Sequence, residues 1–482
     1  MSLSRYRAEW LAPSVPRELM AGAVATFALI PEVIAFAFVA GVDPAVGLFA
    51  SFVIGIVIAF FGGRPAMISA AAGSVALVAA PLVQAHGLRY LLAAGLLAGL
   101  VQIVFGLLRL GVLMRFVSSS VRTGFVNALA VLIFAAQLPH LAGANGATWA
   151  MLALGLAIIY GLPRLTRAVP SPLVCIVVLT LLSSWLGLPL KTVADLGHLP
   201  ETLPIFSWPG VPLVWDTLRI IALPALAIAM VGLLESMMTA SVVDELTDTP
   251  SNKNRECTGL GLANMAASLF GGIAGCGMIG QTVGNVKYGG RGRLSTLFAG
   301  VFLLVLMVLL KPWVSQVPVV ALVAIMVMVS ASTFDWGSLR AVLRHPRTSS
   351  VVVLGTVAVT LATHNLAAGV AVGVLLSGVF FTFKVARLLQ VRAEDAGGVR
   401  TYRVAGQVFF ASADMFVDAF DPREVPGKTV RLDLTQAHFW DVTAVAAFEK
   451  VLQRLRHHGL AVEVLGLNAA SATLIDRLGS AA

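Results

Sequence analysis

The sequence has little charge and little cysteine. Of its 482 residues, 12% are Asp, Glu, Lys or Arg and 58% are hydrophobic, which excludes an ordinary soluble protein. The three cysteines form no CxxC or Cys/His pattern, so we expect no disulfide framework, no structural metal and no cofactor. No nucleophile and base are grouped in any motif, which argues against an enzyme. Because the first 18 residues are polar and a full-length apolar run follows, we expect no cleavable signal peptide.

Long apolar runs fill the sequence from residue 18 to about residue 392. A bilayer core of about 30 Å takes about 20 apolar residues in one helix, and the lengths and breaks of the runs predict fourteen membrane spans. The predicted spans lie near residues 19–40, 44–61, 67–83, 88–108, 121–139, 148–163, 169–187, 215–239, 256–272, 278–289, 294–312, 317–334, 347–363 and 366–386. The chain is therefore predicted to be a polytopic protein of the lipid bilayer.

Positive charge is concentrated in the loops of this apolar part. Residues 1–392 hold 24 Lys and Arg against 13 Asp and Glu, and residues 393–482 hold 9 against 11. Twenty of the 24 cations fall in one set of alternate loops, and the other four are Arg89, Lys191, Arg219 and Lys311. The positive-inside rule then places both termini in the cytoplasm of a bacterium, with the chain in the inner membrane. Because the charges punctuate apolar runs, we expect no nucleic-acid partner.

Two halves of seven spans each are predicted, one at about 17–190 and the other at about 213–392. A proline-rich linker at about 188–215 separates them. Seven is odd, so the second half is inverted relative to the first. Each half contains an interrupted segment after an aromatic-Gly-Gly sequence, at 62–81 and at 271–293, and the second segment carries nine glycines. Paired interrupted segments in inverted repeats indicate a transport site near the middle of the membrane.

The interrupted segments predict two half-helices, one starting near Gly73 and one near Gln281. Their free N–H groups and positive dipole ends would face a common point and form an anion site. The alternative is that small residues allow close helix packing. That explanation accounts for residues 70–72 but accounts poorly for the glycine and amide cluster at 271–292.

Two carboxylates within the predicted spans are candidate site residues. Glu32 follows Pro31 in the first span, where an ionisable residue by default marks a pathway or a proton relay. Its alternative role is a protonated carboxyl held by a backbone carbonyl that Pro31 frees. Glu235 and Thr239 stand four residues apart on one helix face. They are candidates for binding a cation or the substrate, or for satisfying one another at a helix contact.

Residues 393–482 lack the long apolar runs of the preceding part, and their pattern predicts a small α/β module. Strands are predicted at 402–410, 430–434 and 461–467, and helices at 442–457 and 469–478. Asp441 and Thr443 lie where a strand meets a helix, and the favoured role is capping of that helix.

Several motifs together resemble the SulP sulfate-permease family of anion transporters, whose animal members include prestin and pendrin. They are Pro31-Glu32 with Ala35-Phe36, the Phe-Gly-Gly before the third span, the sequence GLLESMMTA at 232–240, and Asn285 with Gly289-Gly290-Arg291. The C-terminal module resembles a STAS domain. The resemblance covers nearly the whole chain.

The resemblance implies an all-α membrane domain of seven plus seven inverted spans, usually a homodimer, with a cytoplasmic STAS domain that could bind a protein partner. Spans one to four and eight to eleven would form a core that moves against a gate. The implied substrate contacts are Glu32, Phe36, Gly73, Ser74, Gly280, Gln281 and Thr282, and the implied ion-coupling residues are Glu32, Glu235 and Thr239.

Two departures from the family shape the expected function. Many relatives carry Gln where this chain has Glu32, and many carry Arg at the position aligned with Gln281. A lost cation and a gained carboxyl favour symport of a small anion with H⁺, such as the carboxylates fumarate and succinate. The alternatives are Na⁺-coupled bicarbonate transport, sulfate transport, and an anion channel or a STAS-linked sensor. In the STAS part, Thr443 stands where antagonist relatives carry a phosphorylatable Ser, and we expect no phosphorylation there.

Overall fold

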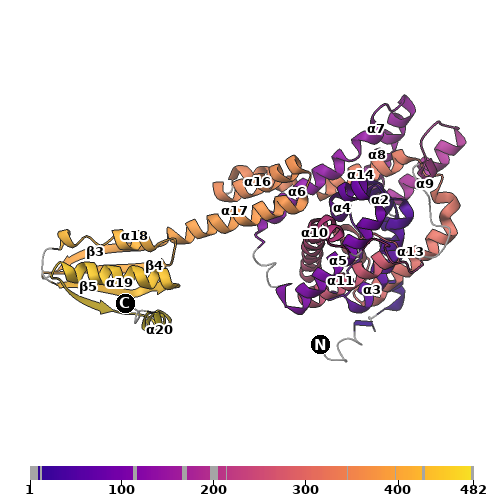
Figure 1. The fold of residues 1–482 in the computed structure, drawn as a ribbon. Helices are drawn as coiled ribbons and strands as arrows, with labels where there is room; N and C mark the ends of the chain where they lie inside the picture. Colours follow the sequence, from indigo (N-terminus) through magenta and orange to yellow (C-terminus); the bar gives the residue numbers. More distant parts are fainter. Residues whose placement is uncertain are drawn as a thin grey trace. The chain divides into compact units, whose positions relative to one another are not determined.

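The computed structural model describes residues 9–10, 14–111, 117–165, 171–195, 205–212, 214–344, 346–396, 398–425 and 429–478. Contacts divide the chain into two compact units, Met1–Val374 and Leu375–Ala482, and each is treated by itself below (Figure 1). The predicted loop cations Arg5, Arg7, Arg115 and Arg167, and linker residues 196–204, lie outside the described residues.

The first half of the membrane part consists of helices and one short strand. In chain order these are α2 (Val15–Ala40), α3 (Pro44–Phe61), β1 (Ser69–Ala71), α4 (Gly73–His86), α5 (Leu88–Leu107), α6 (Ser119–Ala135), α7 (Leu138–Leu141), α8 (Gly146–Leu165) and α9 (Ser171–Trp185).

The second half repeats this order. It contains α10 (Trp215–Thr247), α11 (Lys253–Leu269), β2 (Gly275–Gly277), α12 (Ile279–Lys287), α13 (Arg293–Val314), α14 (Val319–Thr333), α15 (Trp336–Arg344), α16 (Arg347–Thr363) and α17 (Leu366–Ala386). In the first half, a strand and a short helix occupy the third predicted span, and in the second half the strand lies just before that span and the short helix lies within it.

A helix lies in each of the fourteen predicted spans. Eight of the described helices are long and apolar enough to cross a membrane, and the crossing of all fourteen stays a prediction. One helix extends well beyond its predicted span. The span is expected to end at 239, whereas α10 continues to Thr247 and has 33 residues, which makes it about 50 Å long at 1.5 Å per residue. The sequence suggested an earlier end because Asp244 and Glu245 interrupt the apolar run.

The helices of the membrane part fall into two packed groups. Helices α2, α3 and α5 pack against α10, α11 and α13, so the first four predicted spans of each half interlock. In the other group α6 packs against α14 and α16, and α8 packs against α9 and α14. Small residues permit the close approach in the first group: a β-carbon on Gly99 would lie 2.6 Å from the Gly261 carbonyl oxygen.

The C-terminal part is an α/β sheet with the strand order β3-β4-β5-β6. Strands β3 (Gln390–Ala396) and β4 (Val399–Val408) are antiparallel, and β4, β5 (Thr429–Phe439) and β6 (Ala461–Leu465) are parallel. Helices α18 (Ala413–Asp418), α19 (Val442–His457) and α20 (Ala469–Leu478) complete the part.

The predicted strands and helices of the C-terminal part are present, but β3 and α18 were not predicted. Strand β3 has a mostly exposed sequence, QVRAEDA, without apolar alternation. It begins at Gln390, before the predicted domain boundary at 393, and that boundary stays a prediction. The core of this part gathers Phe416, Phe420, Leu432, Leu434 and Phe448.

Candidate functional site

The two interrupted segments meet as a pair of antiparallel strands. Strand β1 pairs with β2 in the register Ser69 to Gly277, Ala70 to Cys276 and Ala71 to Gly275. Each strand leads within two residues into the N-terminus of its half-helix, α4 or α12. A β-carbon on Gly275 would lie 2.0 Å from the Ala70 carbonyl oxygen, so this strand crossing requires glycine. Because the strands are antiparallel, both helix N-termini point back toward the crossing.

Glu235 of α10 joins the two segments. Its Oε2 accepts a hydrogen bond from the Ser74 hydroxyl in the first turn of α4 and one from the Cys276 thiol of β2, at 3.0 Å from Sγ. The side chain is 9% exposed. No described residue donates to the other oxygen, Oε1. This oxygen is also not one of the fully buried polar atoms that lack a hydrogen-bond partner, so it is accessible. Glu235 therefore has one anchored oxygen and one oxygen open to the site.

Helix α2 contributes Glu32 and Phe36. The Glu32 carboxyl interacts with the Gln281 side chain and with the Glu235 charge, and it is half-buried. One turn further along, the Phe36 ring lies on the first residue of α4, where a β-carbon on Gly73 would be 2.6 Å from Phe36 Cε1. One face of α2 thus reaches both half-helices.

The first turn of α12 has an open face and a buried face. Gly280 is exposed, and a β-carbon there would meet nothing within 4 Å. By contrast, Thr282 is 0% exposed, and its hydroxyl both accepts from Ile68 N at 2.9 Å and donates to Ile68 O at 3.2 Å. The Thr282 hydroxyl therefore holds the backbone of Ile68, just before β1. The contact of Thr282 with substrate that the resemblance implies stays a prediction.

Thr239 lies one turn after Glu235 on α10. Its hydroxyl donates to the Glu235 carbonyl at 2.9 Å and to the Gly277 carbonyl at 2.9 Å. Gly277 N in turn donates to the Ser236 hydroxyl at 2.9 Å. Helix α10 therefore holds β2 by side chains on two successive turns. Thr239, Glu235 and Gly277 gather oxygen atoms of the kind that a hard cation such as Na⁺ prefers.

The sequence did not single out four side chains that build the site. Cys276 is 0% exposed and donates a hydrogen bond to Glu235. Asn264 of α11 bonds both backbone groups of Gly275, and its Nδ2 also donates a 2.9 Å hydrogen bond to Gln102 Oε1 of α5. Ser236 is the fourth. A polar residue inside an apolar helix was the available signal for Gln102, Ser236 and Asn264.

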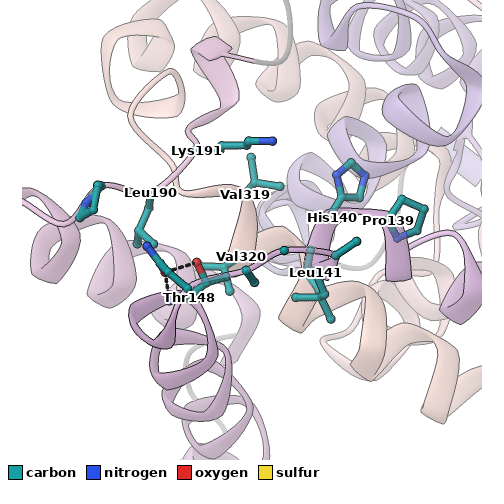
Figure 2. Close-up of a pocket in the computed structure, with 14 residues that line it drawn as sticks. Pro139, His140, Leu141, Thr148, Leu190, Lys191, Val319 and Val320 are labelled. Carbon is teal, nitrogen blue, oxygen red and sulfur yellow. Dashed lines mark hydrogen bonds between the residues drawn. The ribbon is translucent and has the colours of Figure 1, made fainter.

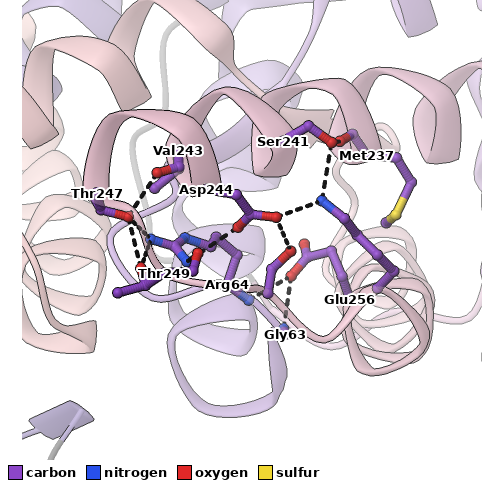
Figure 3. Close-up of polar contacts among 11 residues, drawn as sticks. Gly63, Arg64, Met237, Ser241, Val243, Asp244, Thr247, Thr249 and Glu256 are labelled. Atoms are coloured by element: carbon purple, nitrogen blue, oxygen red, sulfur yellow. Dashed lines mark hydrogen bonds and ion pairs between the residues drawn. The ribbon is translucent and has the colours of Figure 1, made fainter.

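A second polar cluster holds the segment that precedes β1 (Figure 3). The Arg64 guanidinium donates to Asp244 Oδ1 at 3.1 Å and to the Thr249 carbonyl at 2.8 Å. Gly63 N and Arg64 N both donate to Glu256 Oε2, at 2.7 and 3.1 Å. Asp244 also receives Lys253 at 3.0 Å. The structure thus pairs Asp244 with two cations and ties the start of the first interrupted segment to α10 and α11.

The site can attract an anion by helix dipoles and N–H groups, and it holds two carboxylates. Among the implied site residues no side chain is cationic. Within the described ranges, no group of three or more His, Cys, Asp or Glu side chains is arranged to hold a metal ion.

Comparisons with known proteins agree with this architecture. The chain matches the sulfate permease family over residues 16–153 and 144–357, and it matches the STAS domain over residues 390–482. A putative sulfate transporter of Bacillus subtilis, YbaR, is 49% identical, with 96% of this chain and 97% of the relative covered. The bicarbonate transporter BicA of Synechocystis is 27% identical, with 90% and 85% covered.

Solved structures show the same fold. The structure of SLC26A9 superposes with a TM-score of 0.82 at 17% identity, covering 99% of this chain and 87% of that chain. The transmembrane domain of BicA gives a TM-score of 0.66 at 26% identity, covering 75% and 97%. The fold class is thus an all-α membrane domain followed by a small α/β domain, and the relatives are transporters rather than enzymes. The chain belongs to the sulfate permease family of anion transporters and carries a C-terminal STAS domain.

Proposed function

We propose that the protein is a secondary active transporter that carries a small carboxylate, such as fumarate or succinate, together with a proton by alternating access. The observation that carries this proposal is the charge of the site: two half-helix N-termini face the same strand crossing as Glu32 and Glu235. The substrate would lie in front of Gly73, Ser74, Gly280 and Gln281, beside Phe36.

Charge balance favours coupling to a cation. A buried, unpaired charge costs several kcal/mol or more, and a dicarboxylate such as fumarate beside two ionised carboxylates would place four negative charges together. The dipole of each half-helix supplies only about half a positive charge. Binding of a proton to Glu32 would remove one negative charge as the substrate enters, and release of that proton on the other side would expel the substrate.

The choice of a carboxylate follows from the donors. Backbone N–H groups at two helix ends and the Gln281 amide can bond the oxygens of a planar anion without a bidentate guanidinium. Sulfate is tetrahedral rather than planar, and none of these residues offers a guanidinium to bind it in a bidentate manner. The relatives are named as sulfate and bicarbonate transporters, so sulfate remains one arm of the test.

Na⁺-coupled bicarbonate transport is the second candidate. It is favoured by the oxygen cluster of Glu235, Thr239 and Gly277 and by the 27% identical bicarbonate transporter. In that case the cation would bind to the accessible Oε1 of Glu235. Glu32 would then line the substrate site without taking up a proton.

Further parts of the proposal concern assembly and location. The protein would act as a homodimer in a bacterial inner membrane, with both termini in the cytoplasm. The STAS domain would there be available to a cytoplasmic protein partner.

Uptake into proteoliposomes tests the proposal. Labelled fumarate, bicarbonate and sulfate are each supplied with and without an inward proton gradient, and with and without Na⁺. We expect fumarate to accumulate with the proton gradient alone. Accumulation of bicarbonate that requires Na⁺ would support the second candidate instead. Passive equilibration of an anion with no response to either gradient would indicate a channel, and binding without uptake would indicate a sensor.

A further inference from the structure

We propose that a hollow at the predicted outer end of the membrane part is a second anion-binding site, which collects small anions before they reach the half-helices. We call it the outer hollow. It has a volume of about 220 Å³ and is lined by the loop between α7 and α8, by residues 189–191, and by the first turns of α14 (Figure 2). The kind of anion rests on the proposed function, but the existence of the site does not.

Two side chains with nitrogen donors line the outer hollow. Lys191 and His140 both line it, and Figure 2 shows the Lys191 side chain extended toward the side of the hollow that holds His140. Neither side chain forms a hydrogen bond or an ion pair with any described residue. The described residues of the lining include no acidic one. An ammonium and an imidazole that no described residue hydrogen-bonds form a donor pair suited to a carboxylate or an inorganic anion.

Lys191 is held in place, although it lies in a proline-rich linker. Lys191 O accepts from Val319 N at 2.9 Å, and Val193 N donates to Val317 O at 2.9 Å, on either side of an isolated bridge between Thr192 and Pro318. This short antiparallel contact fixes the Lys191 backbone against the start of α14. A lysine whose backbone is fixed loses less freedom on binding an anion than a lysine on a loose loop would.

The other walls of the outer hollow also strengthen the attraction for an anion. Val319, Val320 and Val323 form an apolar wall, which lowers the local dielectric and strengthens the attraction of Lys191 for an anion. Helix α8 begins at the hollow, and Asn145 caps it by accepting from Thr148 N at 2.8 Å. The positive end of the 20-residue helix α8 adds to the Lys191 charge.

The negative charge of Asp195 opposes the positive potential that Lys191 gives to the outer hollow. Hydrogen bonds from the Thr192 backbone N–H and hydroxyl lower the pKa of Asp195, so it is ionised at neutral pH. Its Oδ2 is engaged with Thr192, at 2.7 Å from N and 2.9 Å from Oγ1, and Asp195 does not line the hollow. It weakens the field of Lys191 without occupying the site, so we expect weak binding that suits a collecting site.

His140 connects the outer hollow with a second one. That hollow has a volume of about 570 Å³ and is lined by the α2–α3 connection, by the ends of α4 and α5, and by His140. Its wall includes Asp43, which disfavours an anion there. An anion would therefore rest at Lys191 and His140, beside the helices that carry the half-helix site.

Chemical protection of Lys191 tests the site without requiring transport. Full-length protein in proteoliposomes is treated with a membrane-impermeant amine-acetylating reagent, and labelling is measured by mass spectrometry. Millimolar sodium fumarate, sulfate or bicarbonate should slow labelling of Lys191 several-fold at constant ionic strength. Labelling of Lys311, the other lysine assigned to the same predicted face, should not change. Equal effects on both lysines, or no effect on Lys191, would overturn the proposal, even if none of the three anions is transported.

Uptake kinetics test what the site does. A positively charged hollow raises the local concentration of anions and the rate at which they enter. Because K191Q removes this charge, it should raise the KM for external substrate roughly three- to tenfold with kcat unchanged. The increase should shrink at high salt, because exposed charges are screened. R219Q is the matched control, since Arg219 is another outer-face cation and lies over the Trp215 ring, 5.7 Å from its centroid. A normal KM in K191Q, or the same increase in R219Q, would contradict the proposal.

Discussion

The two interrupted segments share one plan but differ in chemistry. In each, a three-residue strand leads into a half-helix. The first segment contributes mainly backbone, since residues 70–72 are alanines. The second contributes side chains that reach the backbone of the first: Thr282 bonds Ile68, and Asn285 Nδ2 donates to the Ala66 carbonyl at 2.8 Å. Part of the polar cluster that marked the second segment as a binding site is therefore a clamp on the first.

The largest effect is expected at Gly73. In G73A the new β-carbon would lie 2.6 Å from the Phe36 ring, and overpacking of this kind costs about 1–3 kcal/mol. We expect a lower melting temperature and at least a tenfold loss of uptake. In the second segment, the glycine in the first turn of the half-helix is Gly280, and no described atom lies within 4 Å of a β-carbon there, so G280A should melt like the wild type and show a raised KM. Normal uptake in G73A would contradict this contrast.

The clamp is tested by T282V. This near-isosteric change leaves Ile68 N without its buried acceptor, which costs about 1–3 kcal/mol. The melting temperature of the purified protein should fall by several degrees. S69A is the control from the first segment, because the buried Ser69 hydroxyl has no hydrogen-bond partner among the described residues, and its loss should be neutral. Equal melting temperatures for T282V and S69A would show that the clamp does not stabilise the segment.

A smaller effect is expected from the two donors to Glu235. Ser74 comes from the first segment and Cys276 from the second, and both bond Oε2. S74A and C276A should each change the concentration of the coupling cation that half-saturates uptake by about three- to tenfold, since one hydrogen bond contributes about 0.5–1.5 kcal/mol net. C276S keeps a donor and should change it less. If all three variants couple like the wild type, Glu235 is not the coupling residue.

The smallest effect on transport is expected in the STAS domain. Asp441 caps α19 through Ala444 N at 2.9 Å and also accepts from Phe410 N at 2.9 Å. Loss of a cap costs about 1 kcal/mol, so D441A should lower the melting temperature of this domain while substrate preference stays unchanged. T443A changes an exposed residue and should do neither. A switched substrate preference in D441A would mean that the transport site is not where we place it.

Much of the membrane fold could be predicted from the sequence, because apolar run lengths and loop charges are local signals. The repeated glycine pairs indicated where the helices break, and the structure pairs those two breaks as strands. The resemblance to the sulfate permease family then supplied the grouping of helices, which periodicity alone does not give. Strand β3 was missed because an exposed edge strand carries no apolar alternation.

The partners of polar side chains could not be predicted, because they join segments far apart in sequence. Arg64 and Arg293 were interpreted as loop cations, yet they are 6% and 1% exposed. Arg293 donates to the carbonyls of Ala59 and Gly62 at 2.9 and 2.8 Å. A rule that counts loop charges detects the sign of these residues but not their burial. The role of Cys276 was likewise hidden, because it depends on a strand crossing with Ala70.

The most direct test of the account is proton-driven uptake of labelled fumarate in the wild type and in E32Q, without Na⁺. Glu32 faces Gln281 and the Glu235 charge, and glutamine keeps its shape but cannot exchange a proton. We predict that the wild type accumulates fumarate when an inward proton gradient is applied. E32Q should only equilibrate it, at a rate that no longer responds to pH. Accumulation by E32Q with unchanged pH dependence would contradict the assignment of Glu32 as the proton site.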